Sequence, residues 1–173
     1  MAYTLLTLVL FGAAIYGLIQ WLRVQDEALA GTRYPDMGRG HVPQCVPQYN
    51  STPPTSGCHQ PTWAPWEVSD APIPDGLQVH NLEHGGVMIQ YRPDPIPGLP
   101  GAHVEDLQAF VQDLRQQRKY CKVILAPYPG LQDPIALTAW GWLQTLDEFD
   151  ETAVKRFIDD HIEKGPELNT PCP

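Results

Sequence analysis

The hydrophobic pattern opens with an apolar run over residues 2–22 that contains no charged side chain. About 20 apolar residues are enough for a helix to cross the hydrocarbon core of a bilayer. Trp21 falls where an interfacial aromatic residue belongs, and Arg23 follows the run. The pattern therefore predicts a single-pass transmembrane helix over residues 1–24, with the lipid bilayer as its partner. A cleaved signal peptide is the alternative, although no Lys or Arg precedes the run.

Small residues lie together within this run. Ala13 and Gly17 are four residues apart, and Gly12 is beside them. Small residues at this spacing let a second membrane helix approach closely. The spacing predicts packing against other membrane-protein subunits through this face. The alternative is a lone anchor that contains ordinary small residues.

The chain after the anchor divides into a stalk and one domain. Residues 25–40 are polar and rich in glycine, which predicts a stalk, and residues 41–173 are expected to form one globular domain. Residues 41–74 are dense in proline, which removes backbone donors and disfavours helix. Trp63 and Trp66 are embedded there and can cover apolar surface. We therefore expect an irregular but ordered layer that wraps the domain.

Regular elements are predicted by period-2 and period-3.6 patterns in the rest of the domain. Strands are expected at residues 77–82, 86–92, 122–126 and 135–146, and helices at residues 103–118 and after an N-cap at Asp150. Gly141 is expected to mark a bulge in the last strand. The order predicts an α+β domain, in which two helices cover one face of a four-stranded sheet.

Charge and motifs limit the function. The 173 residues include 11 Lys+Arg against 20 Asp+Glu, which gives a net charge of −9. Such a surface repels phosphate backbones, and no basic stripe interrupts it, so nucleic acid is not an expected partner. The sequence contains no Gly-x-Ser-x-Gly, P-loop, dinucleotide-binding or His-Glu-x-x-His motif. We assign no catalytic residue, and the motifs favour a protein that is not an enzyme.

The cysteines Cys45, Cys58, Cys121 and Cys172 form an even set without a C-x-x-C pair. Outside the cytoplasm such a set predicts two disulfides. We favour the pairs Cys45–Cys58 and Cys121–Cys172, because each ties a proline-rich segment to the body of the domain. Two alternatives remain open. The four thiols could be reduced and partly buried, or Cys58, next to His59, could be a thiolate metal ligand.

Candidate metal ligands lie in and near residues 79–91, where two histidines and a carboxylate precede a Gly-Gly pair. His59, His80 and His84 form the predicted metal site, because imidazole nitrogen suits copper and zinc. Glu83 is a further ligand, a partner to a ligand, or a base. A helical turn would bring His80 and His84 within reach of one ion, whereas an extended strand would separate them by about 13 Å.

The alternative reading of these histidines is structural, with hydrogen bonds that hold the proline-rich layer to the sheet. The remaining histidines are expected to lie on the surface or on a helix face, since none has a second candidate ligand at close spacing: His41, His103 and His161.

Three blocks of this sequence resemble a known family. Residues 49–57 with His59, residues 79–87 and residues 137–141 are similar to the signature blocks of domain-of-unknown-function family 3105. The resemblance covers roughly residues 40–165. It implies an N-terminal membrane anchor followed by one globular domain outside the cytoplasm, and it implies no settled activity. Cys58 stands where the family pattern usually has proline, which favours a disulfide particular to this chain.

Two functions follow from these patterns. The first is an extracytoplasmic accessory or interaction protein, anchored in the membrane and packed on a larger membrane complex. The alternative is an extracytoplasmic metal-binding module that uses the histidine cluster to hold copper or zinc. A metal-dependent enzyme is a third and weaker hypothesis.

Overall fold

The computed structural model describes residues 10–21, 29–94, 101–168 and 170–171. The chain divides into two compact units, Met1–Ala30 and Gly31–Pro173. The division lies within the range predicted as the stalk.

The first unit contains a helix over residues 10–21. Among the described residues, no helix is long and apolar enough to cross a membrane. This finding contradicts the transmembrane helix predicted over residues 1–24. Gly12, Ala13 and Gly17 lie on the described helix, and their role in helix packing stays a prediction.

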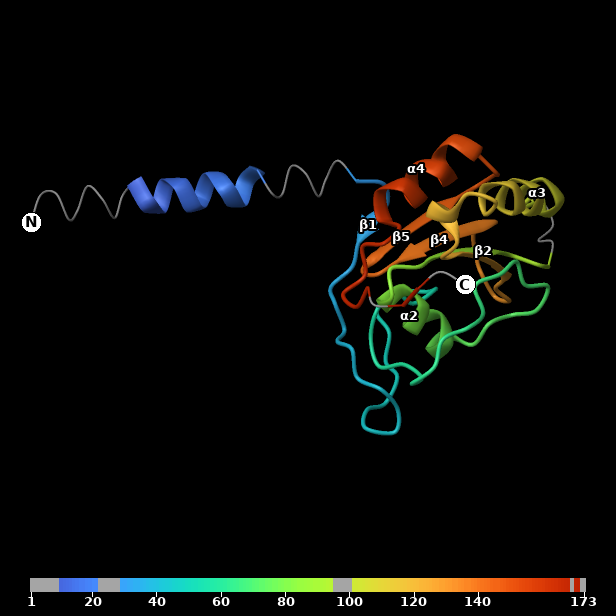
Figure 1. Cartoon of the computed structure of the whole chain (residues 1–173), viewed down its shortest axis with the longest axis horizontal. Helices are drawn as coiled ribbons and strands as arrows, with labels where there is room; N and C mark the ends of the chain where they lie inside the picture. The colour runs from blue at the N-terminus through green and yellow to red at the C-terminus, as the bar shows by residue number, and fades with distance from the viewer. Residues whose placement is uncertain (1–9, 22–28, 95–100, 169, 172–173) are drawn as a thin grey trace, which may run out of the picture. The chain divides into compact units, whose positions relative to one another are not determined.

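The second unit is built on a mixed sheet (Figure 1). Five strands follow the order β1-β5-β4-β2-β3, and only the pair β2–β3 is parallel. The strands are β1 (Thr32–Arg33), β2 (Val87–Tyr91), β3 (Val123–Pro127), β4 (Ile135–Ala139) and β5 (Trp142–Leu146). The predicted four-stranded sheet is therefore wrong in its strand count and in two of its strands.

Helices cover both faces of this sheet. α3 (Val104–Leu114) and α4 (Glu151–His161) lie on one side, and α2 (Asp75–Glu83) lies on the other with the irregular residues 41–74 (Figure 1). α3 and α4 occupy the ranges predicted to be helical. The carboxylate of Asp150 caps α4 by accepting a 3.1 Å hydrogen bond from the backbone N–H of Ala153.

The first predicted strand, residues 77–82, is in fact part of helix α2. Leu77 and Val79 alternate with polar residues, which suggested a strand, but Val79 and Leu82 are three apart and both are fully buried. Because α2 lies between the sheet and the wrapping layer, its polar residues are buried as well. A helix enclosed in this way has no polar face, and so its sequence loses the period of 3.6.

The last predicted strand, residues 135–146, is in fact a hairpin. β4 and β5 pair antiparallel, and Ala139 is opposite Trp142. Gly141 completes the two-residue turn with a φ of 74°, a left-handed conformation that glycine adopts without steric cost. The glycine predicted to mark a bulge therefore reverses the chain.

Strands β2, β3 and β4 form the centre of the core. Every residue of these strands is buried, because the sheet is covered on both faces. On the α2 side, Trp66 of the irregular layer packs in one cluster with Leu82, Met88 and Ile124. The irregular layer is thus part of the core, and it is held directly against α2.

Candidate metal centre

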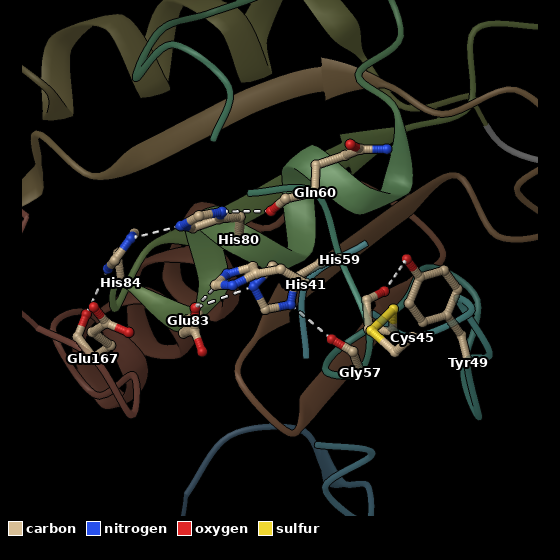
Figure 2. A network of polar contacts seen from close by, with 11 residues as sticks. His41, Cys45, Tyr49, Gly57, His59, Gln60, His80, Glu83, His84 and Glu167 are labelled. Atoms are coloured by element: carbon tan, nitrogen blue, oxygen red, sulfur yellow. Dashed lines mark hydrogen bonds and ion pairs between the residues drawn. A yellow bond between two sulfur atoms is a disulfide. The ribbon is translucent and has the colours of Figure 1, made fainter. Parts of the chain in front are cut away.

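Four side chains converge beside α2. His41, His59, His80 and Glu83 each offer one ligand atom, and these atoms all lie within 4.8 Å of one another (Figure 2). His59, His80 and Glu83 are at most 5% exposed, and His41 is half-buried. Two of the four come from the irregular layer and two from the helix, so the centre lies at the junction of both.

Helix α2 supplies two of these groups and a close neighbour. His80 and Glu83 are three residues apart, which brings them to the same face of a helix. His84 follows as the C-cap residue, one turn after His80. The helical geometry on which the metal hypothesis depends is therefore present, and the extended geometry that would separate the two histidines is not.

Backbone carbonyl groups fix the orientation of three imidazole rings. In each ring Nδ1 lies 2.7 Å from a carbonyl oxygen: that of Gly57 for His59, of Gln60 for His80 and of Glu167 for His84 (Figure 2). A carbonyl oxygen only accepts, so each Nδ1 carries the hydrogen. A neutral ring then has its lone pair on Nε2. Metal-binding histidines typically have this arrangement, with the outer nitrogen held by a carbonyl or carboxylate group.

The second ring nitrogen, Nε2, faces another acceptor in His80 and in His59. Nε2 of His80 lies 2.9 Å from Nε2 of His84, and Nε2 of His59 lies 3.1 Å from Oε2 of Glu83. Two lone pairs cannot form a hydrogen bond with each other, so each contact needs a positive charge nearby, either a proton or a metal ion. Burial, with a smaller effect of the neighbouring histidines, lowers the pKa of His80 despite its bond to Gln60. The lowered pKa favours the neutral ring, which is the form that binds metals.

His41 contributes a nitrogen that has no hydrogen-bond partner among the described residues. Its Nε2 is buried without a hydrogen bond to any described residue, and it lies 3.9 Å from Oε2 of Glu83. The ring stacks on His80 with 5.2 Å between centroids and meets the edge of His59 at 4.6 Å. Leaving a buried polar atom unsatisfied costs about 1–3 kcal/mol. A ligand between these four side chains would remove that cost.

The disulfide Cys45–Cys58 connects the two segments that carry His41 and His59. This confirms the predicted pair and excludes Cys58 as a thiolate ligand. Cys121 also forms a disulfide, and its predicted partner Cys172 lies outside the described residues. His41 was expected to be a surface or helix-face residue and was missed as a candidate ligand. The cysteine pattern carried the signal, because a Cys45–Cys58 bond brings the residues just before Cys45 next to His59.

His84 was predicted to be a ligand, but it lies at the margin of the centre. It contacts His80, yet the group of four converging ligands contains Glu83 and His41 instead. The buried ammonium group of Lys122 donates 3.0 Å bonds to the carbonyl oxygen of His84 and to the Glu163 carboxylate. These bonds anchor the end of α2.

The other two histidines lie at helix ends. His103 is the exposed N-cap residue of α3, and His161 is buried at the end of α4 between Trp142 and Phe157. Neither belongs to the group of four ligands.

Two tryptophans border the cluster. Trp63 meets His80 and His84 edge-on, with ring centroids 5.4 Å and 5.2 Å apart, and 45% of its surface is exposed. Trp140 lies 6.4 Å from His59. These indole rings shield the imidazoles from solvent.

The donor set matches a particular kind of ion. Three imidazole nitrogens and one carboxylate oxygen suit zinc and copper, whereas calcium and magnesium prefer a shell of oxygen atoms. In a tetrahedral zinc site with bonds of about 2.0–2.1 Å, neighbouring ligand atoms lie about 3.3 Å apart. Since the four ligand atoms here are already within 4.8 Å, small side-chain rotations would bring them to that spacing.

The fold and the site define a class of protein, an α+β domain in which a proline-rich layer and a buried helix gather histidines around one carboxylate. Within this class the chain belongs to domain-of-unknown-function family 3105. The family profile, described as "Protein of unknown function (DUF3105)", matches residues 41–173. The match begins at His41 and includes all four candidate ligands. No curated protein and no solved structure matches the chain.

Proposed function

We propose that this protein is a metal-binding module that holds one zinc or copper ion between His41, His59, His80 and Glu83. One observation carries the proposal. The rings of His59 and His80 each donate a hydrogen bond from Nδ1 to a backbone carbonyl group, which leaves the Nε2 lone pairs for a cation. These lone pairs point at other acceptors rather than at donors.

The energetics of the cluster support the same function. Two buried histidines, the half-buried His41 and a buried carboxylate lie together, and in the neutral form of the rings the Nε2 atoms of His59 and His80 have no hydrogen-bond donor to face. A cluster with a purely structural role would be expected to pair each lone pair with a donor. A bound cation would satisfy the carboxylate charge and the facing lone pairs at once.

The number of protein ligands favours binding over catalysis. Structural zinc sites are typically closed by four protein ligands, whereas catalytic sites keep one position for water or substrate. His41, His59, His80 and Glu83 would supply four. We therefore propose that the domain binds, stores or delivers an ion.

The disulfides support an extracytoplasmic location. Disulfides persist in oxidising compartments and are rare in the cytosol. Cys45–Cys58 borders the proposed ligands, and Cys121 forms a second bond. The accessory-subunit function stays a separate prediction. The described residues offer a specific geometric argument for an ion, which is why metal binding is the function proposed.

Elemental analysis and zinc titration of the purified full-length chain test the proposal. His80→Asn removes a proposed ligand. His103→Asn is the matched control, because His103 is exposed on α3 and has a φ of 46°, which asparagine tolerates. We expect about one zinc or copper ion per chain in the wild type and in His103→Asn, and none retained by His80→Asn. A wild-type protein that takes up neither ion, or a His80→Asn variant that binds as tightly, would refute the proposal.

A further inference from the structure

We propose that the Cys45–Cys58 disulfide holds His41 in the ligand set, so that reduction of this bond weakens metal binding. The inference rests on the metal-binding function proposed above. It adds a means of control, in which the thiol–disulfide state of the surroundings sets the affinity of the site.

Of the two ligands in the irregular layer, His41 depends on the disulfide most directly, because the ring of His59 is also held by its Nδ1 bond to the Gly57 carbonyl group. His41 is four residues before Cys45, and His59 follows Cys58. A side-chain carbon added at Gly40 would lie 2.8 Å from Sγ of Cys45, so the sulfur packs against the backbone next to His41. The disulfide therefore supports the turn that carries this ligand.

Backbone bonds and ring contacts also hold His41: its carbonyl oxygen accepts a 3.0 Å bond from Gln44 N–H, and its ring lies against those of His59 and His80. An isolated bridge joins His41 to His59 through hydrogen bonds of 2.9 Å, from Val42 N–H to the His59 carbonyl oxygen and from His59 N–H to that of Gly40. Nε2 of His41 has no hydrogen-bond partner among the described residues. Two further bonds join the same segments, from Met37 N–H to the Ser56 hydroxyl oxygen at 3.0 Å and from Gly57 N–H to the Gly38 carbonyl oxygen at 3.1 Å. The Cys45–Cys58 disulfide adds a covalent restraint on the turn that carries His41.

The remaining ligands are held independently of the disulfide. His80 and Glu83 belong to α2, and the amide of Asn81 in the same helix bonds to both backbone groups of Ala64. Loss of the disulfide would therefore remove His41 from the set and leave the ligands on α2 in position. Metal affinity would fall, and the domain would keep its fold.

The bond is accessible to a reductant. Cys45 is half-buried, whereas Cys58 is 7% exposed. A thiolate of a dithiol attacks Sγ of Cys45, and Cys58 leaves as a thiolate. The second thiol of the reductant then displaces Cys45 and closes a cyclic disulfide. Two electrons pass to the protein, and the two protons of the dithiol end on Cys45 and Cys58.

Reduction and metal binding are linked in both directions. If reduction weakens metal binding by a given factor, bound metal makes the disulfide harder to reduce by the same factor. Under oxidising conditions the site would hold its ion, and a reducing partner would release it. The partner class implied is therefore a thiol–disulfide oxidoreductase or a small dithiol.

A mutant cycle on the full-length chain, with zinc as the probe, tests this inference. The affinity is measured by competition with a chromophoric chelator for the wild type, His41→Ala, the pair Cys45→Ser with Cys58→Ser, and the combination of all three. We expect the serine pair and His41→Ala each to weaken zinc binding by roughly 10–100-fold. Because both changes remove the same ligand, the combination is expected to bind no more weakly than His41→Ala alone.

Three results overturn the inference. They are an unchanged affinity in the serine pair, effects that add in the combination, and a folded wild-type protein that keeps its zinc after a phosphine has reduced the Cys45–Cys58 bond. If the serine pair fails to fold, zinc retention by the phosphine-reduced wild-type protein tests the inference instead. A wild-type protein that binds no zinc would instead refute the metal-binding function, so the two failures are distinguishable.

Discussion

Nε2 of His80 lies 2.9 Å from Nε2 of His84, although the Nδ1 atom of each ring donates to a backbone carbonyl group. Neutral rings oriented in this way present two lone pairs to each other. The same conflict exists between His59 and Glu83. A folded protein that retains such contacts has a cluster suited to a cation.

Exchange of Glu83 for glutamine is expected to affect metal binding and stability in opposite directions. Glu83→Gln removes the negative charge, and zinc affinity should fall by roughly 10–100-fold, as for changes close to a metal. In the metal-free protein, the new amide N–H can donate to Nε2 of His59, 3.1 Å from the present carboxylate oxygen. The free energy of unfolding should therefore stay equal or rise, by up to about 1 kcal/mol.

Zinc titration and urea denaturation of metal-free protein measure these two effects. Glu105→Gln is the control, because Glu105 is exposed on α3 and has the same change of charge. A Glu83→Gln variant that unfolds more easily without metal would contradict the reading of His59 as a ring with a free lone pair.

Acid is expected to destabilise the metal-free protein through His80. Burial lowers the pKa of His80 below its ordinary value of 6.5. Below pH 6.5 the unfolded chain takes up a proton at this residue while the folded protein leaves it neutral, so the unfolded state binds more protons. The free energy of unfolding then decreases as the pH falls from 6.5 toward the lower folded pKa, and it is unaffected by this group at higher pH.

Denaturation of the metal-free protein between pH 5 and pH 8, the range in which histidine titrates, checks this prediction. His80→Asn should flatten the decrease, and His103→Asn should leave it unchanged. If the free energy of unfolding decreases as steeply with falling pH in His80→Asn as in the wild type, the pH dependence comes from other groups.

The amide of Asn81 joins helix α2 to the irregular layer. Its Oδ1 accepts a 2.8 Å bond from Ala64 N–H, and its Nδ2 donates a 2.9 Å bond to the Ala64 carbonyl oxygen. Asn81→Ala would leave both backbone groups unsatisfied in a buried position. We expect the free energy of unfolding to fall by about 2–6 kcal/mol, since each of the two unsatisfied groups costs about 1–3 kcal/mol. Denaturant unfolding measures the loss.

Asn50→Ala is the comparison for Asn81→Ala, because the Asn50 side chain also donates to a backbone carbonyl group, that of Pro35, but is exposed. This variant should lose less than about 1 kcal/mol. Equal losses of unfolding free energy in the two variants would show that the Asn81 bonds to Ala64 stabilise the fold no more than an exposed side-chain bond does.

The sequence predicted the chemistry of the site better than its local structure. The Cys45–Cys58 bond and the presence of His59 and His80 among the candidate ligands could be anticipated, because these residue types restrict what they do. The helical structure of α2 could not be anticipated. A helix that is buried on all sides has no polar face, so its sequence does not show a hydrophobic period of 3.6 residues. The predicted strand at residues 77–82 was the consequence.

His41 shows a second limit of prediction from sequence. No residue close to His41 in sequence suggests a ligand, and its role depends on contacts across the disulfide. The orientation of each imidazole ring depends on carbonyl groups of Gly57, Gln60 and Glu167. Backbone groups have no signature in the sequence, so only the folded chain reveals that the lone pairs face one another.

The tight approach of the C-terminal segment to the end of α2 gives the last prediction. Gly85 has a φ of 77°, and a side-chain carbon there would lie 2.9 Å from Cα of Glu163 and 2.8 Å from Cδ2 of Leu168. Gly85→Ala therefore adds a backbone clash to the strain of a left-handed conformation. We expect the free energy of unfolding to fall by about 2–4 kcal/mol. Zinc affinity should fall too, because displacement of residues 163–168 breaks the bond from His84 to Glu167.

Gly130→Ala is the control that introduces the strain of a left-handed conformation without a steric clash. Gly130 has a φ of 84°, but a side-chain carbon there would meet nothing within 4 Å. The control should lose only about 1–2 kcal/mol, the cost of the left-handed conformation in a residue with Cβ, and should bind zinc like the wild type. Denaturant unfolding and zinc titration of both variants measure the difference. If Gly85→Ala loses no more stability than Gly130→Ala and binds zinc normally, the C-terminal segment does not support the metal centre.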